Sequence, residues 1–142
     1  MIVVDDHLLF DLLADIASPA LRGSAAHGVT TSSSWHYRLL RALKYGTGEG
    51  TISRAARTLG DEQHQRVISL LETLPPWIAT TEARELVPAM VECSARAKGN
   101  YLTLEAVAIA VLRDADLYVS VRSDLLFAAA GALGVSVHVL DR

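Results

Sequence analysis

Covalent cross-links and membrane segments are what this sequence most clearly lacks. Its 142 residues include a single cysteine, Cys93, which excludes a disulfide framework. No apolar stretch approaches the roughly 18 residues that a transmembrane helix needs, so we expect no membrane insertion. The first residues are acidic where a secretory signal would be basic, and we therefore expect a cytoplasmic protein.

Charge and metal-binding spacings are also sparse. Charged residues make up 20% of the chain against 51% hydrophobic residues, which excludes intrinsic disorder. The histidines show no His-x-x-x-His spacing, so the sequence does not indicate zinc. Basic and aromatic residues are not interleaved, so sequence-specific reading of RNA is not predicted. Gly46, Gly48 and Gly50 do not follow a strand, which favours a break in the chain over a phosphate-binding loop.

Alternating apolar patterns predict one α/β domain over residues 1–142. The β-branched run from Ile2 to Val4 is typical of a buried strand, and helical spacings and further short strands follow it. Such alternation predicts a three-layer α/β/α fold with a short parallel central sheet. Strands are predicted at 2–4, 77–79, 117–121 and 135–140, and helices at 8–16, 34–45, 52–59, 62–74, 81–97, 103–113 and 125–133.

Local signals predict how several of these elements begin and end. The small and polar residues 22–34 are predicted to form a connection. Pro88 should kink or restart its helix, Thr103 is a good N-cap, and Gly134 is the expected glycine just past a helix end. Cys93 is predicted to be a small buried apolar residue.

Ligands of parallel sheets bind beyond the carboxyl ends of the strands. Asp5 and Asp6 follow the first predicted strand, and Arg122 to Asp124 follow the strand that comes after Asp116. The sequence therefore predicts a site at these positions.

The segment Val4-Asp5-Asp6-His7 resembles the start of a response-regulator receiver domain, in which paired acids hold magnesium beside a phosphoacceptor aspartate. No strand ends in an aspartate about 45 residues later, and no Lys-Pro dipeptide occurs. The receiver domain therefore stays only as an alternative interpretation.

Four segments carry a second resemblance, and together they span nearly the whole chain. They are Met1-Ile-Val-Val-Asp5, Leu39-Leu-Arg-Ala-Leu43, Leu102-Thr-Leu-Glu-Ala-Val-Ala-Ile-Ala110, and the closing Leu117-Tyr-Val-Ser-Val121 with Leu125, Ala128-Ala129 and Gly134-Val-Ser-Val137. In this order and spacing they resemble the PIN domain, in particular the toxins of VapBC toxin–antitoxin pairs.

This resemblance implies a metal-dependent endoribonuclease that cleaves RNA with carboxylate-bound Mg²⁺ or Mn²⁺. In-line cleavage needs charge stabilisation at the attacking and leaving oxygens, which hard cations held by carboxylates supply. The implied ligands and catalytic residues are Asp5 and Glu105, with Asp124 as a third. The resemblance also implies an antitoxin protein as partner and a homodimer.

Two positions depart from the family pattern, because Arg38 and Arg122 stand where it places acids. A guanidinium cannot ligate a cation but pairs well with carboxylates. The two arginines would then neutralise Asp5 and Glu105, or one of them would bind the scissile phosphate beside a single metal. Arg41, three residues after Arg38 on the same helix face, is a further candidate for phosphate contact.

Each acid also has a structural interpretation. Asp5 could cap the first helix, and Asp6 is expected to be the cap rather than a ligand. Glu105 and Asp124 lie in predicted first helical turns, where the helix dipole favours any acid. The sequence thus leaves open a second function, in which a degenerate PIN-like module binds a protein or RNA without cleaving it.

Overall fold

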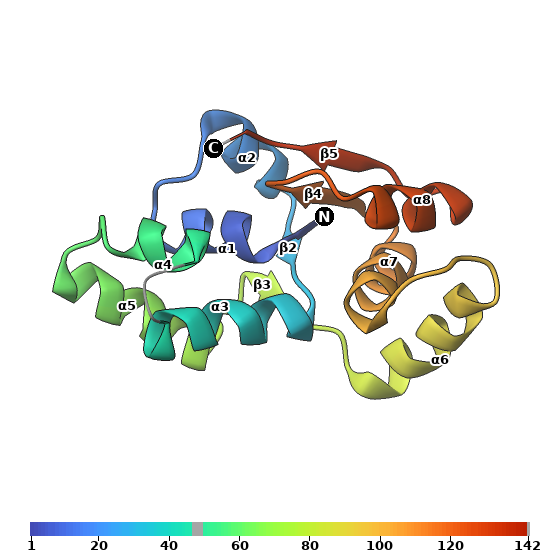
Figure 1. The fold of residues 1–142 in the computed structure, drawn as a ribbon, viewed down its shortest axis with the longest axis horizontal. Helices are drawn as coiled ribbons and strands as arrows, with labels where there is room; N and C mark the ends of the chain where they lie inside the picture. The colour runs from blue at the N-terminus through green and yellow to red at the C-terminus, as the bar shows by residue number, and fades with distance from the viewer. Residues whose placement is uncertain (47–49, 142) are drawn as a thin grey trace.

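A five-stranded parallel sheet forms the centre of the molecule. The computed structural model describes residues 1–46 and 50–141 and confirms the predicted three-layer α/β/α fold (Figure 1). The strands lie in the order β3-β2-β1-β4-β5, and each neighbouring pair is parallel. Their bounds are β1 Ile2–Val4, β2 Val29–Thr30, β3 Ile78–Ala79, β4 Asp116–Val119 and β5 Val137–Val139.

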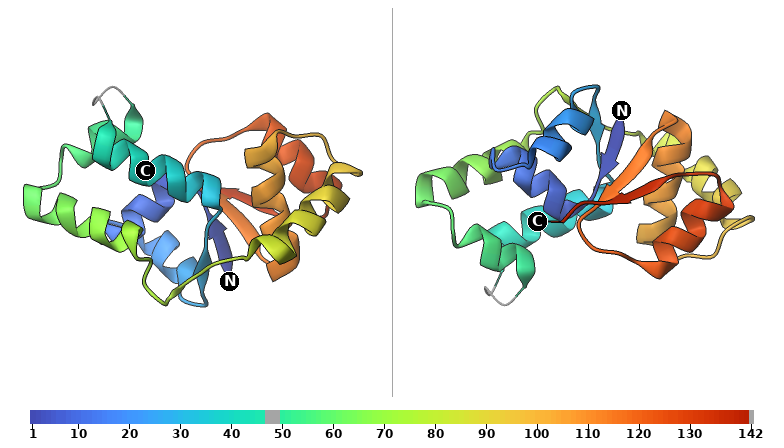
Figure 2. Two further views of the ribbon diagram at one scale, coloured as in Figure 1. Left: turned by 90° about the horizontal axis from the view of Figure 1, so that it is seen from below. Right: turned by 90° about the horizontal axis from the view of Figure 1, so that it is seen from above.

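The helices cover the two faces of the sheet in two groups (Figure 2). One group connects β1, β2 and β3, and the other connects β3, β4 and β5. The two groups lie on opposite faces because right-handed crossovers change face when the chain reverses its direction across the sheet. The bounds are α1 Asp6–Leu13, α2 Pro19–Ala25, α3 Ser33–Tyr45, α4 Thr51–Ala56, α5 Asp61–Glu72, α6 Ala83–Ser94, α7 Tyr101–Arg113 and α8 Asp124–Ala132.

The strand β1 contributes to both halves of the core. Ile2 and Val4 lie in the cluster packed under α1 to α5, whereas Val3 lies in the cluster packed under α6 to α8. This alternation follows from the two-residue period of a strand. All three side chains are buried, so the carboxylates that follow begin at a fixed point in the middle of the sheet.

The sheet has its topological switch point between β1 and β4. From β1 the chain proceeds toward β2 and β3, and from β4 it proceeds toward β5 on the other side. Ligands of open α/β sheets bind in the crevice at such a point. The observed strand order also differs from the 2-1-3-4-5 order of receiver domains, so the topology does not support the receiver alternative.

The connection predicted over residues 22–34 is wrong, because α2 and β2 occupy part of it. Ser18 caps α2, its Oγ accepting a hydrogen bond from the Leu21 N–H at 3.2 Å. The Thr30 hydroxyl of β2 donates to the Ala79 carbonyl at 2.8 Å. A two-residue strand carries too little pattern for the sequence to reveal, and its position depends on the strands that flank it.

Two predicted helix signals are also corrected. Asn100 rather than Thr103 caps α7, since the Asn100 Oδ1 accepts from the Thr103 N–H at 2.9 Å. The restart predicted at Pro88 does not occur, because α6 continues from Ala83 to Ser94. Burial of Leu86, Met90 and Cys93 of α6 against the core offsets the backbone hydrogen bond that a proline removes.

Other local predictions are confirmed. Gly134 follows α8 with φ +73°, and the next N–H, of Val135, donates to the Ala130 carbonyl at 2.9 Å. Cys93 is buried. The break predicted at Gly46 to Gly50 lies largely at residues 47–49, outside the described residues. None of the helices in the described ranges is long and apolar enough to cross a membrane.

Candidate functional site

A cleft of about 250 Å³ opens at the switch point. Polar side chains reach it from the segment after β1, from the segment after β4, from α3 and from α7. They are Asp5, Asp6 and His7; Ser120 and Ser123; Arg38; and Thr103. Four separate segments therefore meet where the topology predicts a ligand.

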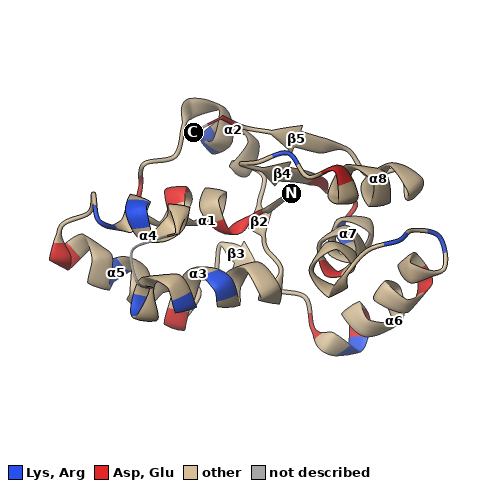
Figure 3. Ribbon diagram, viewed as in Figure 1, with Lys and Arg blue, Asp and Glu red and all other residues tan. Residues whose placement is uncertain are grey.

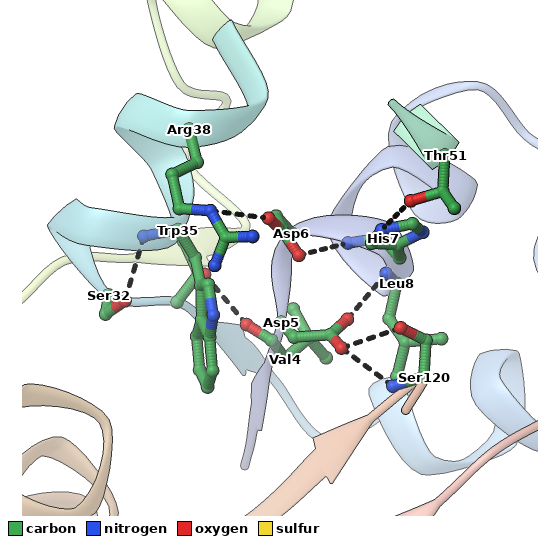
Figure 4. A network of polar contacts seen from close by, with 11 residues as sticks. Val4, Asp5, Asp6, His7, Leu8, Ser32, Trp35, Arg38, Thr51 and Ser120 are labelled. Carbon is green, nitrogen blue, oxygen red and sulfur yellow. Dashed lines mark hydrogen bonds and ion pairs between the residues drawn. The ribbon is translucent and has the colours of Figure 1, made fainter. Parts of the chain in front are cut away.

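Asp5 is held rigidly at the floor of this cleft (Figure 4). Its Oδ1 accepts from the Leu8 N–H at 2.9 Å, which makes Asp5 the N-cap of α1. Its Oδ2 accepts from the Ser120 N–H at 2.7 Å and from the Ser120 hydroxyl at 2.8 Å. A carboxylate offers about four lone-pair directions, so three are used and one is left. Asp5 therefore joins helix α1 to the end of β4 while it keeps some capacity for a ligand.

Asp6 differs from Asp5 in its hydrogen bonding. It is the first residue of α1 and only 3% exposed. Its Oδ1 accepts from the His7 N–H at 3.0 Å, but its buried Oδ2 has no hydrogen-bond partner in the described part of the chain. The expected roles are thus exchanged: Asp5 is the cap, and Asp6 has the available oxygen.

Arg38 is the cation that faces this oxygen. Its Nε lies 3.5 Å from the Asp6 Oδ2, too far for a good hydrogen bond but close enough for an ion pair (Figure 4). The Arg38 side chain is 55% exposed, so water weakens the attraction. The expectation that Arg38 pairs with Asp5 is corrected, because its partner is the neighbouring acid.

Burial raises the pKa of the Asp6 carboxyl above its ordinary value. Arg38 opposes the shift by favouring the charged form, and the negative charge of Asp5 adds to it. Desolvation is the largest cause of the raised pKa, so the half-exposed guanidinium of Arg38 does not fully compensate the buried negative charge of Asp6. An orphaned, incompletely compensated oxygen in a cleft is typical of a binding site.

Glu105 lies elsewhere, although the sequence predicts it beside Asp5. Its Oε1 accepts from the Ser34 N–H at 3.0 Å, and its Oε2 accepts from the Ser33 hydroxyl. It is fully buried and lines a separate cavity of about 90 Å³, which shares none of its lining with the switch-point cleft among the described residues. Glu105 therefore connects α7 to the first turn of α3, the helix that carries Arg38.

Asp124 and Arg122 lie at the surface. The Asp124 side chain is 93% exposed and its Oδ1 accepts from the Arg122 Nε at 3.2 Å. The Arg122 guanidinium also stacks over the Phe127 ring, 4.3 Å from its centroid. The prediction that Arg122 neutralises Glu105 is wrong, because the Arg122 guanidinium contacts Asp124 and Phe127 of α8 instead.

The structure thus does not assemble the three acids predicted as one metal centre. In residues 1–46 and 50–141, no cluster of three or more His, Cys, Asp or Glu side chains is placed to hold a metal ion. Asp5 and Asp6 fit a smaller site, because Mg²⁺ is often bound by one or two carboxylates completed by water and substrate phosphate. The orphaned Asp6 oxygen supports that fit, and Arg38 at 3.5 Å opposes it.

Sequence reasoning missed two residues of the cleft, Ser120 and Thr103. In the sequence, Ser120 is only part of the predicted strand 117–121, and no pattern around it marks it as the partner of Asp5. Comparisons of this chain with protein-family models, with curated proteins and with solved structures found no match.

Proposed function

We propose that this chain is a PIN-like, Mg²⁺- or Mn²⁺-dependent endoribonuclease that acts at the switch-point cleft. The observation that carries the proposal is the buried Asp6 Oδ2, which has no hydrogen-bond partner in the described residues and belongs to a residue that lines the cleft together with a second acid, Asp5. Burying such an oxygen is costly unless something binds it. The parallel sheet and the sequence resemblance support the same class of protein.

The proposed ligands are Asp5 and Asp6, in place of the set of Asp5, Glu105 and Asp124. A bound Mg²⁺ or Mn²⁺ would stabilise charge on the attacking and leaving oxygens of the phosphodiester. Ser120 and the Leu8 N–H hold Asp5 in one orientation, so its carboxylate needs no reorganisation to bind. Arg38, half exposed at the mouth of the cleft, would bind the scissile phosphate as a bidentate donor.

Cleavage of a labelled RNA tests this function. The wild type should cut in the presence of Mn²⁺ and stop when EDTA is added. Asp6→Asn should lose most of the activity, because it removes one of two proposed ligands without changing the size of the side chain. Asp124→Asn, which alters an exposed acid outside the cleft, is the matched control and should cut like the wild type. Equal activity in Asp6→Asn and the wild type would contradict the proposal.

A second function is favoured by the ion pair of Arg38 with Asp6. If the pair keeps cations out, the chain is a degenerate PIN-like module that binds RNA or a protein without cleaving it. Wild-type protein that binds RNA but shows no metal-dependent cleavage would support this second function.

The implied partners and location belong to the same proposal. A homodimer and an antitoxin both need an apolar surface, and the side chains of Val87 and Val91 on α6 are 52% and 65% exposed. We propose that these residues contribute to such a surface. The cytoplasmic location stays a prediction from the sequence.

A further inference from the structure

We propose that a basic groove beside the cleft binds the phosphodiester backbone of single-stranded RNA next to the cleavage point. The inference rests on the proposed function, since it extends the same substrate beyond the reacting phosphate. The groove, named here the α3–α4 groove, encloses about 340 Å³. The side chains that carry the argument are His7, Arg38, Arg41, Tyr45, Thr51 and Ser53, all in its lining.

The α3–α4 groove continues directly from the switch-point cleft. His7 and Arg38 line both, one from α1 and the other from α3. Arg41 follows Arg38 by three residues, so both guanidinium groups lie on the same face of α3. A strand whose phosphate contacts Arg38 in the cleft would therefore bring its next phosphate toward Arg41.

Arg41 is the cation available for that phosphate. Arg38 pairs with Asp6, and the Lys44 Nζ lies 3.8 Å from the Glu72 Oε1. No ion pair of Arg41 occurs within residues 1–46 and 50–141. Figure 3 shows basic residues along α3 and on α4, although the whole chain carries a net charge of -3. The local excess of positive charge attracts a polyanion.

The remaining lining favours nucleic acid over other polyanions. The Thr51 Oγ1 lies 3.0 Å from the His7 Nε2, and this hydrogen bond joins α4 to α1 across the groove. Tyr45 is 74% exposed at the same groove. The Lys44 Nζ lies over one face of its ring, 5.8 Å from the centroid, and the opposite face is the one on which a base would stack. Arginine, hydroxyl and aromatic groups together suit a backbone phosphate followed by an unpaired base, without recognition of a particular sequence.

Equilibrium binding without cleavage tests the groove separately from the reaction. The probe is a fluorescein-labelled, fully 2′-O-methylated RNA of about twelve nucleotides, within the usual range of site sizes. Fluorescence anisotropy is measured in EDTA over roughly 50 to 200 mM KCl. Arg41→Gln should weaken binding about three- to tenfold at the lower salt, and the slope of log K against log salt should fall by about 1. Arg41→Lys should keep the slope, because it keeps the charge.

Arg84→Gln is the control, because Arg84 is an exposed arginine of α6, in the other helix group. It should bind the probe like the wild type. The proposal is overturned if the wild type does not bind the probe, if Arg41→Gln keeps the wild-type affinity and slope, or if Arg84→Gln loses as much. If the variants behave as expected but the wild type never cleaves RNA, the proposed nuclease fails and the groove stands.

Discussion

Replacing Asp6 by asparagine should make the protein more stable at neutral pH. The wild-type Asp6 carboxylate is almost completely buried and has one oxygen without a hydrogen-bond partner among the described residues. Its negative charge is balanced only in part, by the half-exposed guanidinium of Arg38. Asparagine keeps a buried polar group at this position but removes its charge, and an unsatisfied buried group costs about 1–3 kcal/mol when neutral and more when charged. The lost ion pair is worth up to about 1 kcal/mol. The expected net gain is on the order of 1 kcal/mol, or roughly 3 °C in Tm for a domain of this size.

The gain should depend on pH in a defined direction. Burial raises the pKa of Asp6 in the folded state above its unfolded value of 3.8. Between the two pKa values the folded state binds more protons than the unfolded state, so the wild type loses stability as pH rises through that window. Asp6→Asn does not titrate there. The difference in Tm between the two proteins should therefore be largest at pH 7 and should shrink as pH falls toward 4.

Differential scanning calorimetry in EDTA, at several values between pH 4 and pH 7, measures this difference. Comparing the two proteins at each pH cancels the titration of all the other acids. Asp124→Asn is the matched control, because its carboxylate is 93% exposed and its only ion pair in the described residues, with Arg122, lies at the surface; Tm should stay within about 1 °C of the wild type at every pH. A Tm of Asp6→Asn below the wild type at pH 7, or a difference that does not change with pH, would refute the argument.

Three further predictions concern Glu105, Gly134 and Arg38. Glu105→Ala should lower the free energy of unfolding by about 3 kcal/mol in urea denaturation, because it removes the acceptor of the Ser33 and Ser34 hydrogen bonds. Glu105→Gln should lower it clearly less, and a loss below about 1 kcal/mol for the alanine variant would contradict the assigned contact. Gly134→Ala should lower the free energy of unfolding by about 1 kcal/mol in the same assay. Nothing lies near the added Cβ, but the φ of +73° disfavours any side chain. An unchanged free energy of unfolding would contradict that backbone conformation. Arg38→Glu should raise the affinity for Mn²⁺ by about tenfold in calorimetric titration, because it replaces the cation facing Asp6 with a third carboxylate. An unchanged affinity would mean that Arg38 does not control metal binding at the cleft.

The sequence was sufficient for the layers of the fold and for the edge of the sheet that carries the site. Long apolar periodicities predicted the helices, and the short run from Ile2 to Val4 predicted the strand that leads to Asp5. The strand β2, by contrast, has two residues and owes its position to its neighbours β1 and β3. A pattern that short has no period for sequence analysis to detect.

The assignment of the acids depended on geometry that residue type does not encode. Asp5 and Asp6 are adjacent and chemically identical, and only the extended backbone of Asp5, with φ −75° and ψ 177°, makes it the cap. Asp124 lies in the first turn of α8, as predicted, but Glu105 does not lie in the first turn of α7, because that helix begins at Tyr101. Glu105 is buried against α3 whereas Asp124 faces solvent, and that difference depends on how α7 and α8 pack.

The central claim is that the unpartnered oxygen of Asp6, beside Asp5, forms the cation-binding part of the cleft. Titration of the metal-free protein with Mn²⁺ in a calorimeter tests it most directly, with Asp6→Asn and Asp124→Asn as the matched pair. The account predicts one site in the wild type and in Asp124→Asn, and an affinity at least about tenfold lower in Asp6→Asn, equivalent to about 1.4 kcal/mol. Equal affinity in the wild type and Asp6→Asn, or a loss in Asp124→Asn instead, would contradict it.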